Sequence, residues 1–355
     1  MAFDAAFNPQ MLVLARESRG LTQNDLAGQA GISQGELSKI ETGLRVPADE
    51  QVHRLAGCLK YAVEFFYLTE QVRSLSGPCI YSRKRVSTPE RVLRRLLAIV
   101  NVRRIQLRRL LLSVELDVEN GFECMDIEDH DFDAEGIARK VRALWGLPPG
   151  PLVNLVAAIE QAGGIVMRCD FGTLKVDALS QWVAGMPPIF FVNAAMPMDR
   201  VRFTLAHEIG HIVMHRIPTD NMEKEADRFA AELLMPAVDI RPQLDDLTLP
   251  RLASLKPYWR TSMAALLKRA GDLRTITPRT RSFLWTQMGK FGYRRVEPVS
   301  IPWEEPTLID EIIQVHSTDF GYKSGELTRL LHITDEAETV RLYLPKTSRG
   351  LRVVG

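Results

Sequence analysis

The chain contains 355 residues, a length that accommodates two or three domains of ordinary size. Hydrophobic residues make up 46% of it and charged residues 25%, which is the balance of a soluble globular protein with enough apolar material for real cores. The formal net charge of +1 excludes a chain that acts as a whole as a basic binder of polyanions or as an acidic tail.

The cysteines and the apolar stretches exclude several further classes of protein. The four cysteines include no CxxC pair and no structural-zinc spacing, so we expect neither a disulfide framework nor a zinc ribbon. The longest apolar stretch, Val183 to Met198, is interrupted by Pro187, Pro188 and Asn193, which excludes a transmembrane span. The N-terminus lacks a basic n-region and a long apolar h-region. We therefore expect a cytoplasmic protein with reduced thiols and no membrane partner.

The N-terminal region is predicted to form five short helices within residues 1–70. Thr22 is a suitable N-cap for a helix from Gln23 to Gln29, and Ser33 for a helix from Gln34 to Glu41. The three residues Ala30-Gly31-Ile32 form the turn between them. Two short helices joined by a tight turn containing glycine are typical of a helix-turn-helix.

Two blocks of opposite charge follow. Between Arg83 and Arg109 there are ten basic residues and one acidic residue, and near-heptad leucine and valine spacing there predicts one long amphipathic helix. Two interpretations of its basic face stay open: packing on the protein or on a twin helix, and added contact with DNA. Glu115 to Glu135 contains ten acidic residues and no Lys or Arg, which is typical of a solvated linker and marks a domain boundary.

The remaining elements alternate between helices and a few short strands. Helices are predicted from Ala134 to Trp145, Leu152 to Gln161, Asp199 to His215, Asn221 to Leu234, Pro250 to Ala270 and Ser324 to Leu331, and strands at Ile165 to Met167, Ala178 to Ala184, Ile189 to Val192 and Val340 to Leu344. The second and third strands are spaced for a hairpin. The fold class is therefore mainly α with a small β-sheet (α+β). We expect domains at 1–70 and 133–300, a basic helical connector and acidic linker at 71–132, and a small α/β tail at 301–355.

The most specific motif is an H-E-x-x-H formed by His207, Glu208 and His211. It lies within a predicted helix, where residues four apart are about 40° apart around the axis and about 6 Å apart along it. Both imidazoles can therefore reach one zinc ion. Glu208 lies about 100° around the helix from His207, where it can meet a metal-bound water.

A catalytic zinc usually has a third protein ligand and one open position. Glu223 and Asp227, one turn apart on the next predicted helix, fit a ligand and a carboxylate that supports a ligand histidine. Glu225 is the alternative third ligand. His215 is about 12 Å along the axis from His207, so we interpret it as a helix-end histidine and not as a ligand.

The stretch from Arg202 to His211 and the stretch from Glu223 to Pro236 together resemble the ImmA/IrrE family of zinc metallopeptidases. The resemblance implies a gluzincin-like domain in which His207 and His211 bind Zn²⁺, Glu208 activates water and a glutamate of the second helix completes the site. It also implies cleavage of helix-turn-helix repressors, which switches on mobile-element or stress genes. The residue that would stabilise the oxyanion is not identified.

Residues 9–69 resemble the XRE/Cro-type repressor family through the patterns Leu21-Thr22-Gln23, Gly31-Ile32-Ser33-Gln34 and Leu37-Ser38-Lys39. In that family the second helix of the motif enters the major groove of double-stranded DNA, and a dimer reads a palindromic operator. The resemblance implies DNA contacts from Gln23, Ser33, Gln34, Gly35, Ser38 and Lys39. Gln34 could pair with adenine. Glu36 could accept from cytosine or repel phosphate.

The two motifs together predict a DNA-binding regulator fused to a zinc-dependent endopeptidase, acting as a homodimer on a repressor or an antitoxin-like protein in a stress, mobile-element or toxin–antitoxin context. The alternative is a non-catalytic transcription regulator or antitoxin-like repressor whose peptidase-like domain senses zinc or a protein partner. An intact Glu208 favours chemistry, because a purely structural site does not need it. Fusion to a DNA-binding unit favours regulation.

Overall fold

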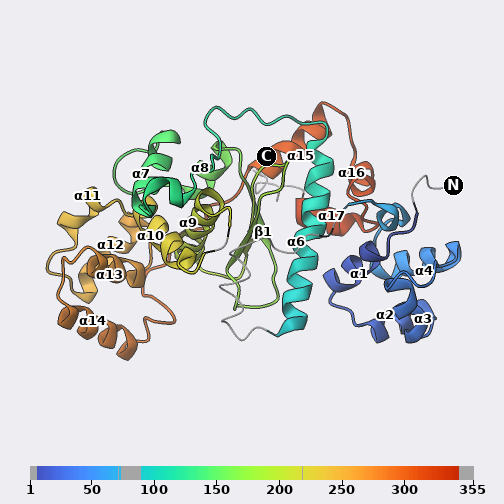
Figure 1. The fold of residues 1–355 in the computed structure, drawn as a ribbon, viewed down its shortest axis with the longest axis horizontal. Helices are drawn as coiled ribbons and strands as arrows, with labels where there is room; N and C mark the ends of the chain where they lie inside the picture. The colour runs from blue at the N-terminus through green and yellow to red at the C-terminus, as the bar shows by residue number, and fades with distance from the viewer. Residues whose placement is uncertain (1–5, 71, 73–88, 218, 344–355) are drawn as a thin grey trace, which may run out of the picture. The chain divides into compact units, whose positions relative to one another are not determined.

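A computed structural model describes residues 6–70, 72, 89–217 and 219–343 of the chain (Figure 1). The described residues form two compact units. The first contains those of Met1–Ser74, Thr88–Leu116 and Thr307–Gly355, and the second those of Asp117–Pro306. In the part of the chain that the structure describes, no helix has the length and apolar character needed to cross a membrane.

The first unit begins with the predicted helix-turn-helix. Its elements are α1 (Pro9–Ser18), α2 (Gln23–Ala30), α3 (Gln34–Glu41), α4 (Asp49–Leu59) and the 3₁₀ helix η1 (Val63–Tyr67). Thr22 and Asp25 form a capping box at the start of α2, and Ser33 caps α3. Gly31 between them has φ +66°, a left-handed conformation that glycine adopts without steric cost. The predicted helices and turn are confirmed, although the fifth helix is a 3₁₀ helix.

Helix α6 (Glu90–Leu111) is the long amphipathic helix that the heptad spacing predicts. Its buried residues Ala98, Val102 and Ile105 belong to the same apolar core as the helix-turn-helix, with Leu26, Leu37, Ile40 and Phe65. The predicted helix is confirmed from Glu90 onward, whereas Arg83 to Arg85 of the basic block lie outside the described residues.

The basic side chains of α6 hold the first unit together. Arg91 donates to the Gly20 carbonyl at 2.8 Å, Arg108 pairs with Glu70 at 2.9 Å, and Arg109 donates to the Leu330 carbonyl at 2.5 Å. Arg104 is 2% exposed. The structure thus favours packing on the protein over contact with DNA for these residues, because their charged groups are occupied by internal acceptors.

The C-terminal helices α15 (Leu308–Thr318), α16 (Ser324–Leu330) and α17 (Glu336–Tyr343) belong to this first unit, where α15 and α16 lie against α6. Ala62 N donates to the His332 carbonyl at 3.0 Å, and Arg19 pairs with Glu338 at 2.7 Å. The region that was expected to be a separate tail is therefore joined to the N-terminal helices by hydrogen bonds.

The strand predicted from Val340 to Leu344 is wrong as far as Tyr343, where the described residues end, because α17 is a helix. Two of the three residues that it buries, Thr339 and Tyr343, are four apart and so share one helical face. Thr339 accepts a hydrogen bond from Thr328 at 2.9 Å, and the Tyr343 hydroxyl donates to Gln106 at 2.5 Å. These contacts bury side chains at the helical spacing of 3.6 residues per turn and therefore favour a helix over a strand, whose buried side chains repeat every two residues.

The second unit contains a three-stranded sheet surrounded by helices. Its elements are η2 (Ile127–His130), α7 (Ala134–Leu144), α8 (Leu155–Gln161), β1 (Ile165–Cys169), β2 (Ala178–Gln181), β3 (Ile189–Asn193), α9 (Met198–Met214), α10 (Met222–Leu234), α11 (Ala237–Ile240), η3 (Arg241–Gln243), α12 (Leu249–Trp259), α13 (Met263–Asp272) and α14 (Pro278–Lys290). The strand order is β1-β3-β2. β2 and β3 pair antiparallel, with Gln181 opposite Ile189, which confirms the predicted hairpin. β1 lies parallel to β3.

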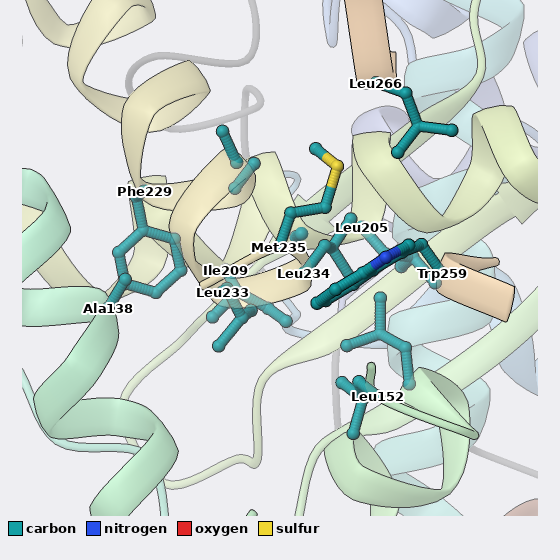
Figure 2. Packing of buried hydrophobic residues seen from close by; sticks show 14 of the residues in the cluster. Ala138, Leu152, Leu205, Ile209, Phe229, Leu233, Leu234, Met235, Trp259 and Leu266 are labelled. Atoms are coloured by element: carbon teal, nitrogen blue, oxygen red, sulfur yellow. The ribbon is translucent and has the colours of Figure 1, made fainter. Parts of the chain in front are cut away.

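Helices α9 and α10 pack closely at the centre of this unit. Gly210 of α9 permits the approach, since a Cβ at that position would lie 3.1 Å from the Phe229 ring and 3.3 Å from Ala226 Cα of α10. Around this contact lies a core that includes Leu205, Ile209, Leu233 and Trp259 (Figure 2). Trp259 extends the core to α12, and the same core also includes residues of α7, α8, α13, α14 and the sheet.

The single helical stretch predicted from Pro250 to Ala270 is wrong in one respect, because it consists of two helices. Arg260 after α12 adopts φ +52°, and the Ser262 side chain caps α13 by accepting from Ala265 N at 3.0 Å. The left-handed residue ends the first helix and the cap starts the second.

A buried ion pair joins distant segments of the second unit. Glu304 is 3% exposed and Arg202 is fully buried, and their side chains are paired. The second oxygen of Glu304 accepts from the backbone N–H groups of Leu155 and Val156 at 2.8 and 3.2 Å, at the start of α8. The carboxylate therefore neutralises a buried guanidinium and caps a helix at the same time.

Removing the charge of Glu304 should destabilise this unit. We expect Glu304→Gln to lower its unfolding free energy by about 3–5 kcal/mol, because the guanidinium of Arg202 is left buried without its counter-ion. All five tryptophans of the chain lie in the second unit, so urea unfolding followed by tryptophan fluorescence reports on it.

The matched control for this variant is Glu305→Gln. Glu305 pairs with Arg168 but its side chain is 63% exposed, so we expect a change of about 0–1 kcal/mol. Equal destabilisation by the two variants would contradict the role assigned to Glu304.

Candidate metal centre and DNA-reading helices

Three side chains converge where α9 meets α10. His207 Nε2 lies 2.9 Å from His211 Nε2. Glu223 of α10 places one carboxylate oxygen 3.5 Å from His207 Nε2 and the other 3.4 Å from His211 Nε2. Among the described residues this is the cluster of His, Cys, Asp and Glu side chains that could hold a metal ion. His207 and His211 are brought together by helical periodicity, and Glu223 by the packing of the two helices.

Two of the three separations between donors are those of a small tetrahedral ion. Zinc bonds of about 2.0–2.1 Å place tetrahedral donors about 3.3–3.4 Å apart; the distances from Glu223 to the two histidines are close to this value, and the two Nε2 atoms lie closer together, at 2.9 Å. Two imidazoles and a carboxylate are also a donor set that zinc accepts. Burial lowers the pKa of His207, but its hydrogen bonds with Asp227 and Glu223 outweigh this effect and raise that pKa to about 9.

A carboxylate and a lysine support His207 from behind. Asp227 Oδ1 lies 3.0 Å from His207 Nδ1, and its other oxygen accepts from Lys268 of α13 at 2.7 Å. Burial alone would raise the pKa of Asp227, but the hydrogen bonds from His207 and Lys268 hold it below its ordinary value. The ionised carboxylate fixes the ring so that Nε2 faces His211 and Glu223. Lys268 has no signal in the sequence that connects it to the motif.

A second support stands behind His211. His215 Nδ1 lies 3.0 Å from His211 Nδ1, and His215 Nε2 lies 3.1 Å from Glu225. Burial, followed by the neighbouring His211 and His207, lowers the pKa of His215 to about 4. The structure thus separates the two glutamates that the sequence left as alternatives: Glu223 joins the donor group, whereas Glu225 contacts His215. His215 follows the last residue of α9, as expected for a helix-end histidine.

Glu208 lies beside this cluster and is 3% exposed. Its Oε2 accepts a hydrogen bond from the Ser180 hydroxyl at 2.6 Å. Ser180 is on β2, which is an edge strand of the sheet. The hydrogen bond orients the carboxylate and connects the edge strand directly to the H-E-x-x-H helix. Sequence reasoning did not identify Ser180, because a single serine on a short strand carries no pattern.

The side chains predicted to read DNA lie on α2, on α3 and at the N-terminal cap of α3. Gln34 donates to Gln23 Oε1 at 2.7 Å, and Gln23 in turn donates to Glu41 at 2.7 Å. Glu41 is paired with the buried Arg16 at 2.6 Å. Both glutamines are therefore held in place before any ligand binds. The other predicted positions, Ser33, Gly35, Ser38 and Lys39, are exposed or partly exposed on α3 and at its cap.

Glu36 is used inside the first unit. It accepts from Gln51 at 2.8 Å and pairs with Arg45 at 3.0 Å. This arrangement offsets the repulsion of phosphate that a free carboxylate on α3 would cause.

Comparisons with known protein families agree with this division of the chain. Residues 12–66 match the family model described as Helix-turn-helix, and residues 159–270 match a peptidase family model described as IrrE N-terminal-like domain. No curated protein matches the chain. The second match spans the sheet, α9, α10 and α13, and thus every side chain of the metal cluster and its supports. The chain is a fusion of an XRE-type helix-turn-helix domain and an IrrE/ImmA-like peptidase-family domain.

Proposed function

We propose that this protein is a DNA-binding regulator whose peptidase-family domain is a zinc-dependent endopeptidase. The observation that carries the proposal is the convergence of His207, His211 and Glu223 next to a buried glutamate that belongs to the same helix. A structural zinc site has four protein ligands, whereas three ligands with an adjacent carboxylate are typical of hydrolytic sites. The fusion to a helix-turn-helix domain supports a regulatory role.

His207, His211 and Glu223 would hold the zinc, which would supply Lewis acidity toward the scissile carbonyl and a lowered pKa for water. Asp227 and Glu225 keep the two imidazoles oriented, the second through His215. Partners of this kind fix the tautomer and direction of ligand histidines. Because the donors are preorganised, little rearrangement is needed when the metal enters.

Glu208 is the residue that would accept the proton of the attacking water and pass it to the leaving amine. Ser180 holds the carboxylate in position by its hydrogen bond at 2.6 Å. In the order β1-β3-β2, β2 is an edge strand of the described sheet, and we propose that a substrate segment adds to the sheet there by β-augmentation. The proposed docking region is Leu179 to Val183.

The substrate that we propose is a helix-turn-helix repressor or an antitoxin-like protein, in a stress, mobile-element or toxin–antitoxin context. The DNA-binding domain would bring the peptidase to the operators at which such a protein acts. We propose that a homodimer reads a palindromic operator, with Gln34 contacting a base and Lys39 a phosphate. The alternative is a regulator that only senses zinc or a partner. The effect of Glu208→Gln on cleavage distinguishes it from this proposal.

The metal proposal predicts about one zinc per chain in the purified full-length protein. His207→Ala should abolish binding, because it removes one of three donors. Glu223→Gln should weaken binding more than Glu225→Gln, which acts only through His215 and should cost about 10–100-fold in affinity. Metal analysis and competition with a chromophoric chelator give these values. A larger loss in Glu225→Gln than in Glu223→Gln would overturn the choice of ligand.

The enzymatic proposal predicts that Glu208→Gln keeps zinc but loses cleavage. Removing the base should lower the cleavage rate roughly 10²–10⁴-fold, so target genes should stay uninduced. The measurement is made in cells, with the size of the candidate partner followed on a blot. His211→Ala serves as the control that also loses zinc. Normal regulation by Glu208→Gln, with an intact partner band in wild-type cells, would show that the protein is a sensor.

The DNA proposal predicts different effects for two side chains of α3. Gln34→Ala should reduce discrimination between operator sequences by about 1–3 kcal/mol, because a base contact is lost. Lys39→Ala should weaken all sequences alike and lower the salt dependence by about one counterion. Binding of the full-length protein to its own promoter region is measured at several salt concentrations. Wild-type binding that ignores sequence would contradict the regulatory half of the proposal.

A further inference from the structure

The segment from Arg274 to Val296, which contains α14, concentrates positive charge in the second unit, beyond the residues that match the peptidase family. It carries six basic residues and no acidic residue. Arg279, Lys290, Arg294 and Arg295 are exposed, and none of these four lies within ion-pair distance of a carboxylate of the described residues.

Several arginines elsewhere in the second unit are paired with carboxylates. Arg168 pairs with Glu305, Arg200 with Asp177, and Arg228 with Glu135. The segment around α14 gathers four exposed cations that lack a carboxylate partner among the described residues, all within one helix and the turn after it. Such a surface carries a local positive potential that attracts anions even though the whole chain is close to neutral.

The geometry of α14 places these charges on a surface that the domain leaves open. The helix packs on α12 and α13 through its other side, where Leu284 and Met288 are buried. At about 100° per residue, Arg279, Phe283 and Lys290 fall within about 40° of one another on the opposite side. Phe283 is 58% exposed and Phe291, just after the helix, is 62% exposed.

The turn after α14 adds two further cations beside the C-terminal half of the helix. Arg294 folds back on the helix, where its Nη2 donates to the Trp285 carbonyl at 2.8 Å and its guanidinium lies 5.7 Å from the Trp285 ring. These contacts fix the side chain but do not neutralise its charge. Phe291 stacks on Tyr293 at 5.6 Å between ring centroids. We refer to Arg279, Phe283, Lys290, Phe291, Arg294 and Arg295 as the α14 surface.

We propose that the α14 surface is a second nucleic-acid contact, which binds the phosphate backbone of double-stranded DNA without reading its sequence. Arginine supplies three of its four charges, and guanidinium groups match phosphate oxygens in geometry. Arg279 and Lys290 are about 16 Å apart along the helix, a span that covers several phosphates at 3.4 Å per step of a strand. The inference rests on the proposed DNA-binding function, since a helix-turn-helix in the same chain would raise the local concentration of duplex for this surface.

The test compares two double variants of the full-length protein. Arg279→Gln/Lys290→Gln removes two charges from the α14 surface. Lys224→Gln/Arg251→Gln removes two exposed charges from other helices of the same domain. Binding to a duplex of random sequence is measured between about 50 and 200 mM salt, the range over which phosphate contacts dominate affinity. All four residues are exposed, and unchanged tryptophan-monitored unfolding confirms that the variants fold.

We expect the α14 variant to lose about two units of the slope of log affinity against log salt, because each phosphate contact contributes about 0.9. The control should keep the wild-type slope. An unchanged slope in the α14 variant, or an equal loss in the control, would overturn the proposal. Poly-glutamate and DNA are also compared as competitors at equal charge. If poly-glutamate competes as strongly as DNA, the proposal is overturned in favour of an acidic protein partner.

A third protein separates this result from failure of the helix-turn-helix proposal. Gln34→Ala/Lys39→Ala should abolish discrimination between operator and random duplex but keep nonspecific binding. Adding the α14 substitutions to this variant should then reduce the remaining nonspecific binding. If the wild type itself shows no discrimination, the helix-turn-helix proposal fails, and the salt slopes still decide the role of the α14 surface.

Discussion

The close packing of α9 against α10 is the constraint on which the candidate site depends. Gly210 allows the two helices to approach until Phe229 and Ala226 lie against its backbone. One turn away, the same approach brings Glu223 to within 3.5 Å of both histidines and Asp227 to within 3.0 Å of His207. A wider separation of the helices would leave two histidines without a third donor. The apolar contact and the polar cluster are therefore two parts of one interface.

Polar groups around the cluster are arranged in successive layers. Asp227 and Lys268 stand behind one histidine, and His215 and Glu225 behind the other. Buried polar groups are costly unless each has a hydrogen-bond partner, so these contacts fix the orientation of the His207 and His211 rings. Ser180 does the same for Glu208 from the sheet. The site is thus built from four separate elements, namely α9, α10, α13 and the edge strand β2.

The first unit is assembled from segments that are far apart in the sequence, at the two ends of the chain. Its core combines the helix-turn-helix with α6, and α15 to α17 complete the unit from the far end of the chain. The second unit is therefore inserted between two parts of the first. Cations that look suited to DNA along α6 are instead bound to internal carbonyls and to Glu70. Charge composition alone does not reveal which cations are available, as the contrast between α6 and α14 illustrates.

The sequence by itself determined the features that depend on local spacing. The H-E-x-x-H places two imidazoles on one helical face through a period of 3.6 residues, and Thr22, Gly31 and Ser33 set the ends of the DNA-reading helices through caps and a left-handed turn. Only the tertiary structure placed Glu223, and not Glu225, beside the two histidines, brought Ser180 and Lys268 to the cluster, and made the predicted strand at Val340 part of helix α17. These features arise from contacts between residues far apart in the chain, and short-range periodicity carries no information about which faces of two helices will meet.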